Sequence, residues 1–163
     1  MAKIGVVLIA VGCCLILAGS VLALSKYWSA GGTTTISAGE NIKVHFGKNF
    51  NDPEISEYSF GNLIPGARVS IWLCIENIGN YTIYGVDWNS TASLVSDGKI
   101  TDDFTDLLLL HNYDDASGPV DWPINLRPNL DGNAVWYVYG RYEVSVASDC
   151  PIGSYSWNLS LIP

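Results

Sequence analysis

The feature that most constrains the fold is an alternation of apolar and polar side chains, which recurs along most of the chain after Gly39. An apolar residue at every second position is typical of a β-strand that buries one face. The clearest runs cover 67–75, 136–146 and 154–161, and shorter ones cover 42–46 and 82–88. Each run predicts a strand with one side toward a core.

Turn-forming residues separate these runs. Pro65-Gly66 suits the centre of a type II turn, and 77–80 and 151–153 combine Gly with Asn or Pro. Short strands between turns, without a long polar helix, indicate an antiparallel β-sandwich. The stretch 102–110 is compatible with either a short helix or a buried strand, and 111–134 is expected to be a long loop.

The N-terminal segment predicts export. Ile4–Leu24 is a run of 21 residues without a charge. As a helix it would be about 31 Å long, close to the thickness of a membrane's hydrocarbon core. It is either a cleaved secretory signal or a retained anchor. We expect a signal or anchor helix at 1–25, a linker or donor strand at 26–38, and a sandwich domain at 39–163 that lies outside the cell.

The charge pattern excludes some functions. The chain has 16 acidic and 8 basic residues among 163, with a formal net charge of −8. Nucleic acids require clustered Lys and Arg, so they are excluded as partners. No catalytic or cofactor-binding motif occurs, and we expect no enzyme activity, no cofactor and no metal site. The one metal left open is Ca²⁺ at Asp102, Asp103 and Asp106 or at Asp114 and Asp115, with a plain acidic surface as the alternative.

Two further features agree with export. Cys74 and Cys150 are the two cysteines after the apolar segment, and an oxidising compartment permits a disulfide between them. Two free buried thiols are the alternative. Asn80, Asn89 and Asn158 each begin an Asn-x-Ser/Thr triplet, so all three are candidate glycosylation sites.

The segment from Lys26 to about Trp88 resembles the TasA/camelysin family of secreted biofilm-matrix fibre subunits, which includes archaeal bundling-pilus relatives. The resemblance lies in the order of four motifs after the apolar leader. They are Tyr27-Trp28-Ser29, Thr33-Thr-Thr-Ile-Ser-Ala-Gly39, Gly61-Asn-Leu-Ile-Pro-Gly66, and a strand that ends in Glu76-Asn-Ile-Gly79. The later half of the chain is similar only as β-rich sequence.

This resemblance implies a jelly-roll or immunoglobulin-like sandwich that assembles by donor-strand complementation, in which an N-terminal strand completes the sheet of a neighbouring copy. A nearly uncharged, β-branched segment suits such a strand. The expected donor residues are Tyr27, Trp28, Thr33, Thr34, Thr35 and Ile36. Gly31-Gly32 is the expected bend, and a flexible stalk is the alternative role of the segment.

We therefore expect a structural subunit of an extracellular pilus or matrix fibre, whose partner is another copy of itself. Head-to-tail strand donation does not close on itself and so produces a filament. One alternative is a type IV pilin-like subunit that keeps the 4–24 helix in the filament core. A second alternative is a membrane-anchored surface domain that binds a ligand. The membrane is involved only through 4–24.

Overall fold

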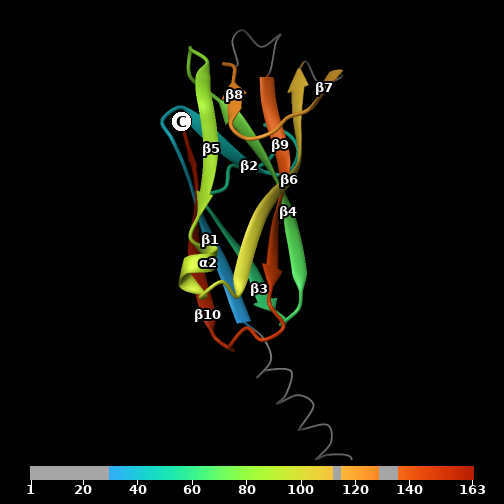
Figure 1. Ribbon diagram of the computed structural model, residues 1–163. Coiled ribbons are helices and arrows are strands. Elements are labelled where there is room, and N and C mark those ends of the chain that lie inside the picture. Colours follow the sequence, from blue (N-terminus) through green and yellow to red (C-terminus); the bar gives the residue numbers. More distant parts are fainter. Residues whose placement is uncertain (1–29, 112–114, 129–135) are drawn as a thin grey trace, which may run out of the picture.

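The computed structural model describes residues 30–111, 115–128 and 136–163, and these form two five-stranded sheets packed face to face (Figure 1). The all-β sandwich predicted from the alternation is therefore confirmed. The predicted apolar helix at 1–25 lies outside the described residues. Within the described ranges, no helix is both long and apolar enough to cross a membrane.

The two sheets are built from strands distant in sequence. The first sheet has the order β3-β1-β10-β5-β8 and the second has the order β2-β4-β9-β6-β7. The strands of the first sheet are β1 (Ala30–Ala38), β3 (Glu57–Leu63), β5 (Ile83–Ser90), β8 (Ile124–Leu126) and β10 (Ser154–Ile162). Those of the second are β2 (Ile42–Phe46), β4 (Arg68–Asn77), β6 (Ile100–His111), β7 (Asp115–Pro119) and β9 (Trp136–Val146). A single helical turn, α2 (Ala92–Val95), follows β5.

The core lies between the sheets, where the predicted apolar faces meet. The inward residues of β4, β9 and β10 are buried, and they include Ile71, Leu73, Ile75, Val138, Tyr142, Val144, Trp157, Leu159 and Leu161. A polar contact also joins the two sheets, since the Trp157 Nε1–H donates to the Tyr142 hydroxyl at 2.8 Å. Phe60 stacks on Trp157 with ring centroids 5.7 Å apart.

The structure assigns strands to the two regions 102–110 and 111–134, for which the sequence shows no clear strand pattern. The stretch 102–110 belongs to β6, so the strand alternative is the right one. The prediction of one long loop over 111–134 is wrong, because β7 pairs with Leu108–His111 and β8 pairs with β5. These short strands have no clear alternation of their own. They depend on partners far along the chain, which local sequence patterns do not report.

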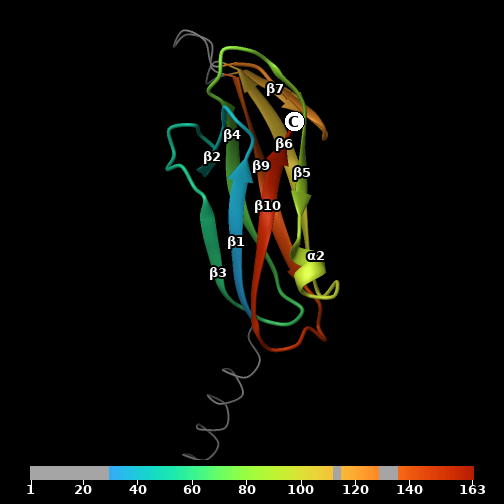
Figure 2. The same cartoon turned by 90° about the vertical axis from the view of Figure 1, so that its left-hand side faces the viewer.

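The first sheet differs from the purely antiparallel prediction. β1 runs parallel to β10 and antiparallel to β3, and it lies between them (Figure 2). The described sandwich therefore begins at Ala30, before the expected boundary at Gly39. The turn before β4 agrees with the sequence: Gly66 has a φ of 84°, and the Ala67 N–H donates to the Ile64 carbonyl at 2.8 Å.

Candidate functional site

The expected donor strand occupies an internal position in the first sheet. Gly31–Ala38 of β1 pair in register with Ser154–Leu161 of β10. On the other edge, Ala30–Thr35 pair with Glu57–Leu63 of β3, with a bulge between Gly32 and Thr33. We term this position between β3 and β10 the β1 slot. Without β1, both neighbouring strands would have an unpaired edge.

The inward face of β1 fills the slot with small side chains. Gly32 is in close contact with the core, since an added Cβ would lie 2.6 Å from Leu63 Cδ1. Thr34 is fully buried, and its hydroxyl has no hydrogen-bond partner among the described atoms. Ile36 is 5% exposed and is the large apolar residue that β1 contributes to the core. The strand is thus held mainly by its backbone pairing.

The structure places four of the six expected donor residues. Thr34 and Ile36 point into the core, Thr35 is exposed on the outer face, and Thr33 is half-buried. Tyr27 and Trp28 lie outside the described residues. The expected bend at Gly31-Gly32 is not present, because both glycines are part of the β1 strand.

The chain bends instead at Gly39–Asn41, between β1 and β2. Asn41 has a φ of 66°, which non-glycine residues seldom adopt except in turns. Three backbone hydrogen bonds hold this bend: Gly39 N–H to Leu161 O at 2.9 Å, Ile42 N–H to Gly39 O at 3.1 Å, and Ile78 N–H to Asn41 O at 2.9 Å. We term Gly39–Asn41 the β1–β2 hinge.

All three candidate glycosylation asparagines are exposed. Asn80 lies in the loop between β4 and β5. Asn89 and Asn158 lie on the outer face of the first sheet, where Asn89 pairs with Ser160. The two strand sites are linked, because the Asn158 N–H donates to the Thr91 hydroxyl at 2.9 Å. Any sugar on Asn89 or Asn158 would therefore project from the same face of the first sheet.

The expected disulfide is absent, since Cys74 and Cys150 are both free and buried. Cys74 lies opposite Tyr139, whereas Cys150 follows the end of β9, beyond Ser145, which pairs with Arg68. Six strand residues separate Arg68 from Cys74, or roughly 20 Å, and a disulfide requires Cα atoms within about 7 Å. Burial raises the pKa of the Cys74 thiol, and the nearby Glu76 and Asp52 carboxylates raise it further.

Two of the acidic residues considered for Ca²⁺, Asp102 and Asp106, have partners within the protein. The Asp102 carboxylate accepts a hydrogen bond from the Tyr142 hydroxyl, and Asp106 pairs with Arg141 at 3.0 Å. Across the three described ranges, no group of three or more His, Cys, Asp or Glu side chains is placed to hold a metal ion. Asp114 lies outside these ranges.

Sequence reasoning missed a buried pair on the outer side of the second sheet. The His45 Nε2 lies 3.2 Å from Glu76 Oε2, and the His45 Nδ1 lies 2.8 Å from the Asp52 carbonyl. Both ring nitrogens of His45 thus face oxygen atoms of neighbouring residues. The pair anchors the loop after β2 against β4. The alternation in 42–46 predicts that His45 points away from the core. It does not predict that His45 lies beside Glu76, because this depends on how β2 pairs with β4.

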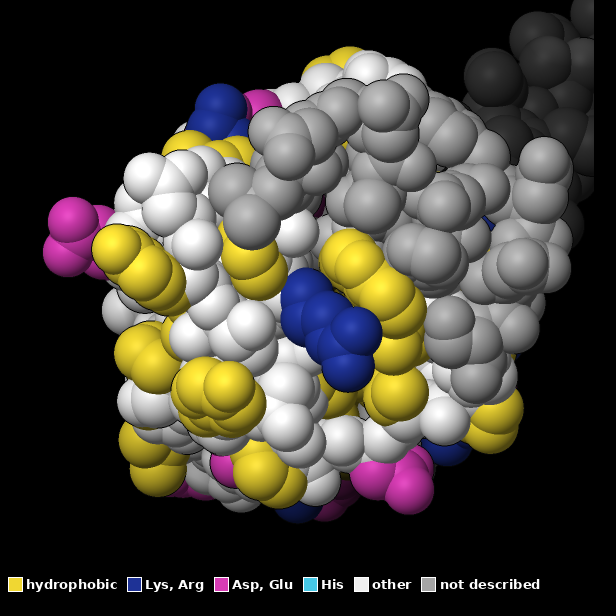
Figure 3. Space-filling model, turned by 90° about the horizontal axis from the view of Figure 1, so that it is seen from above, with side chains coloured by type: hydrophobic (Ala, Val, Ile, Leu, Met, Phe, Trp, Pro, Cys, Tyr) yellow, Lys and Arg dark blue, Asp and Glu magenta, His cyan; other side chains and the backbone are white. Residues whose placement is uncertain are grey.

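The upper end of the sandwich exposes apolar side chains. Tyr81 is 84% exposed and Tyr84 is 73% exposed, and Ile78 is also exposed. Seen from above, hydrophobic side chains are spread over this end, and acidic ones are found mostly at its rim (Figure 3). The hinge touches the same end, because the Ile78 N–H donates to Asn41.

Sequence reasoning also missed a hollow of about 630 Å³ at the bulge of β6. Its lining comes from β4, from β6 and from the segment after β7, and it includes Trp72, Asp106, Asp121 and Trp122. No regular spacing in the sequence indicates that these four residues lie together. The acidic residues made Asp106 a candidate for a calcium site, but no pattern marked the tryptophans as part of a site.

No known family model matches this chain, and a search of curated proteins found no significant match. The resemblance to TasA and camelysin is therefore carried by its motifs alone, and it remains a hypothesis.

Proposed function

We propose that this protein is a structural subunit of an extracellular filament, and that its β1 strand is exchanged between copies. In this proposal, β1 of one copy takes the β1 slot of its neighbour with the same register that it has in its own sheet. The fold would be a jelly-roll-like sandwich of the TasA/camelysin type, and no catalytic activity is involved.

The observation that carries the proposal is the position of β1. It is the first strand of the described chain, yet it pairs on both edges inside the first sheet. No described strand precedes β1, so it can leave its place without pulling a described strand on its N-terminal side, and an identical strand from another copy can replace it with every contact preserved.

The side chains of β1 support the same conclusion. A strand held by backbone hydrogen bonds and small inward residues can leave and re-insert at a lower cost than one anchored by several large apolar groups. Gly32 and Thr34 contribute little apolar area, and only Ile36 is a large anchor. The hinge holds the bend with few backbone bonds, so straightening it costs little.

An engineered disulfide can test the exchange directly. The Ser37 and Ser160 hydroxyl oxygens lie 3.0 Å apart across β1 and β10. Cysteines at these two positions suit a disulfide, whose sulfurs bond at about 2.05 Å. We would express the full chain with Ser37→Cys and Ser160→Cys, remove the competing thiols by Cys13→Ala and Cys14→Ala, and oxidise the exported assemblies before a non-reducing gel.

Each outcome of the gel decides between arrangements. A ladder of covalent oligomers supports strand donation along a filament. A dimer band alone means reciprocal exchange in a closed pair and contradicts the filament. A monomer band alone means that β1 stays in its own sheet. The control is Thr101→Cys with Ser145→Cys, a register pair within one body that should link only inside each copy.

A further inference from the structure

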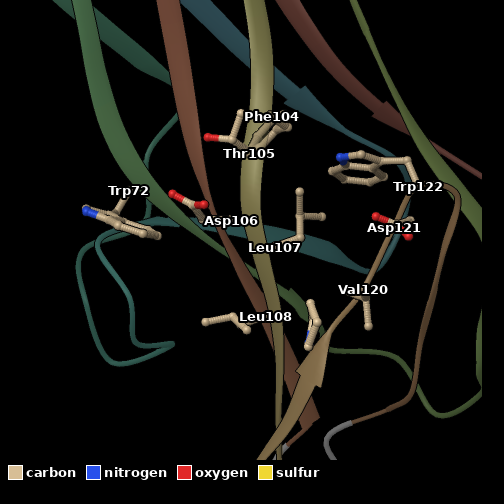
Figure 4. Close-up of a pocket in the computed structure, with 10 residues that line it drawn as sticks. Trp72, Phe104, Thr105, Asp106, Leu107, Leu108, Val120, Asp121 and Trp122 are labelled. Carbon is tan, nitrogen blue, oxygen red and sulfur yellow. The ribbon is translucent and has the colours of Figure 1, made fainter.

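The hollow at the β6 bulge has the construction of a small-ligand site. Its volume of about 630 Å³ lies in the range of pockets that hold small molecules. Trp72 lies on one side of β6 and Trp122 on the other, with Asp106 and Leu107 between them (Figure 4). The hollow thus combines two indole rings with carboxylates.

The bulge itself creates the hollow. The pairing of β6 with β9 shifts between Thr105 and Leu108, and Asp106 has a φ of 53°. As a result Leu107 turns into the core while Asp106 turns outward, where Arg141 neutralises it at 3.0 Å. Gly140 of β9 provides the space, because a Cβ there would lie 3.2 Å from Leu107 Cγ.

The segment after β7 forms the opposite wall. The Val120 N–H donates to the Leu107 carbonyl at 3.1 Å, which fixes this segment against the bulge. The Trp122 ring then meets Phe104 edge to face, with centroids 5.4 Å apart. Both walls are therefore fixed by contacts inside the fold, so the hollow needs no ligand to form.

Two polar groups in this wall have no partner among the described residues. The Trp122 Nε1–H is buried and makes no hydrogen bond, and it lies on the ring edge that faces β6 (Figure 4). The exposed Asp121 carboxylate makes no ion pair or hydrogen bond with any residue of the described ranges. Because protein atoms cover the Trp122 Nε1 atom, the Asp121 carboxylate is the group of these two that a ligand in the hollow can reach.

We propose that this hollow binds a neutral pyranose sugar, either free or at the end of a glycan. A pyranose has an apolar face of C–H groups that packs on an indole, and hydroxyls that donate to a carboxylate such as that of Asp121. Lys48 lies 3.8 Å from the centroid of the Trp72 ring, so the sugar would pack on the part of this indole that Lys48 leaves open to the hollow.

Other ligand classes fit less well. An anion would need a free cation, but Arg141 is paired with Asp106, and the described residues that line the hollow include no Lys or Arg. A metal ion would need more ligands than the described residues bring together. A purely apolar ligand would cover the Asp121 carboxylate without giving it a hydrogen bond, at a cost in affinity.

The test is a direct binding measurement on the full-length chain in a phosphocholine detergent, because detergents with sugar headgroups would compete. The probes are glucose, galactose, mannose, N-acetylglucosamine, maltose and cellobiose. Their binding is measured by saturation-transfer NMR and by tryptophan fluorescence. A ligand of this size is expected to bind with a Kd of about 1 mM. Asp121→Ala, on an exposed side chain, should weaken binding about tenfold.

The matched control is Asp103→Ala, which removes an exposed carboxylate from the same strand as Asp106 but outside the hollow. It should leave the Kd unchanged. Trp72→Ala should abolish binding while circular dichroism shows an intact β fold. The proposal is overturned if none of the six sugars binds more tightly than about 10 mM, or if Asp121→Ala and Asp103→Ala have equal effects. Neither result bears on β1 exchange, which involves the first sheet.

Discussion

Replacing Thr34 by Val should stabilise this protein, although the change alters a fully buried position. The Thr34 side chain is 0% exposed, and its hydroxyl lacks a hydrogen-bond partner among the described atoms. Valine has the same branched shape and fills the same space. It replaces the unpaired hydroxyl with a methyl group, on a strand that already favours β-branched residues.

The size of the effect follows from two terms. Burying a hydroxyl without a partner costs about 1–3 kcal/mol, and this cost disappears in the variant. The added methyl also contributes buried apolar area, for which about 0.8 kcal/mol is typical. The two terms add, so we expect the free energy of unfolding to rise by about 2–4 kcal/mol. For a domain of this size, the Tm would rise by roughly 4–16 °C.

The assay is urea and thermal unfolding of the wild type, Thr34→Val and Thr35→Val. Thr35 is the neighbouring residue on the exposed face of β1, so its variant should change stability by no more than about 0.5 kcal/mol. If Thr34→Val is neutral or destabilising, the hydroxyl has a partner, such as a buried water, and the reasoning fails. An equal gain in both variants would assign the effect to β-propensity instead.

Three further variants test the core. Gly32→Ala should lower stability by about 1–3 kcal/mol in urea unfolding, because its Cβ would lie 3.1 Å from Trp157, while Gly31→Ala meets nothing closer than 3.5 Å and should be nearly neutral. Tyr142→Phe removes the acceptor of the Trp157 N–H and should cost about 1–3 kcal/mol; a thermal midpoint equal to wild type would contradict this. Burial raises the pKa of both Cys74 and Tyr142 above their ordinary values, about 8.5 and 10. The unfolded chain therefore loses these protons first, so the urea midpoint should fall as pH rises above about 8.5, and less steeply in Tyr142→Phe.

The alternation of apolar and polar residues predicts those strands that keep one face against the core along their whole length. Ile71, Leu73 and Ile75 alternate because the core lies on one side of β4 throughout. The same reasoning holds for β9 and β10. In the same way, the turn at Pro65-Gly66 was predictable, because only residues 64–67 determine it.

Features that depend on distant contacts were not predictable. The alternation of β6 changes parity at the bulge, because Phe104 and Leu107, three residues apart, both face the main core, whereas Leu110 packs beside Cys74 and Tyr137 on the other side. The disulfide prediction failed because the separation of two cysteines depends on strand register, which the spacing of residues 74 and 150 does not report. The hollow could not be predicted because the segment that carries Trp122 packs against β6, a strand from earlier in the chain.

In the proposed exchange of β1, the difference in free energy between the closed and exchanged states is set by the hinge rather than by the strand. A donated β1 makes the same contacts in the neighbour's slot as in its own, so the two states differ mainly in the hinge bonds from Ile42 to Gly39 and from Ile78 to Asn41. Each such bond contributes about 1 kcal/mol. This small difference can be offset by protein concentration and by new contacts between the exposed ends of adjoining bodies. Thr34→Val should therefore stabilise the closed and the exchanged states equally, and slow the passage between them without shifting their ratio.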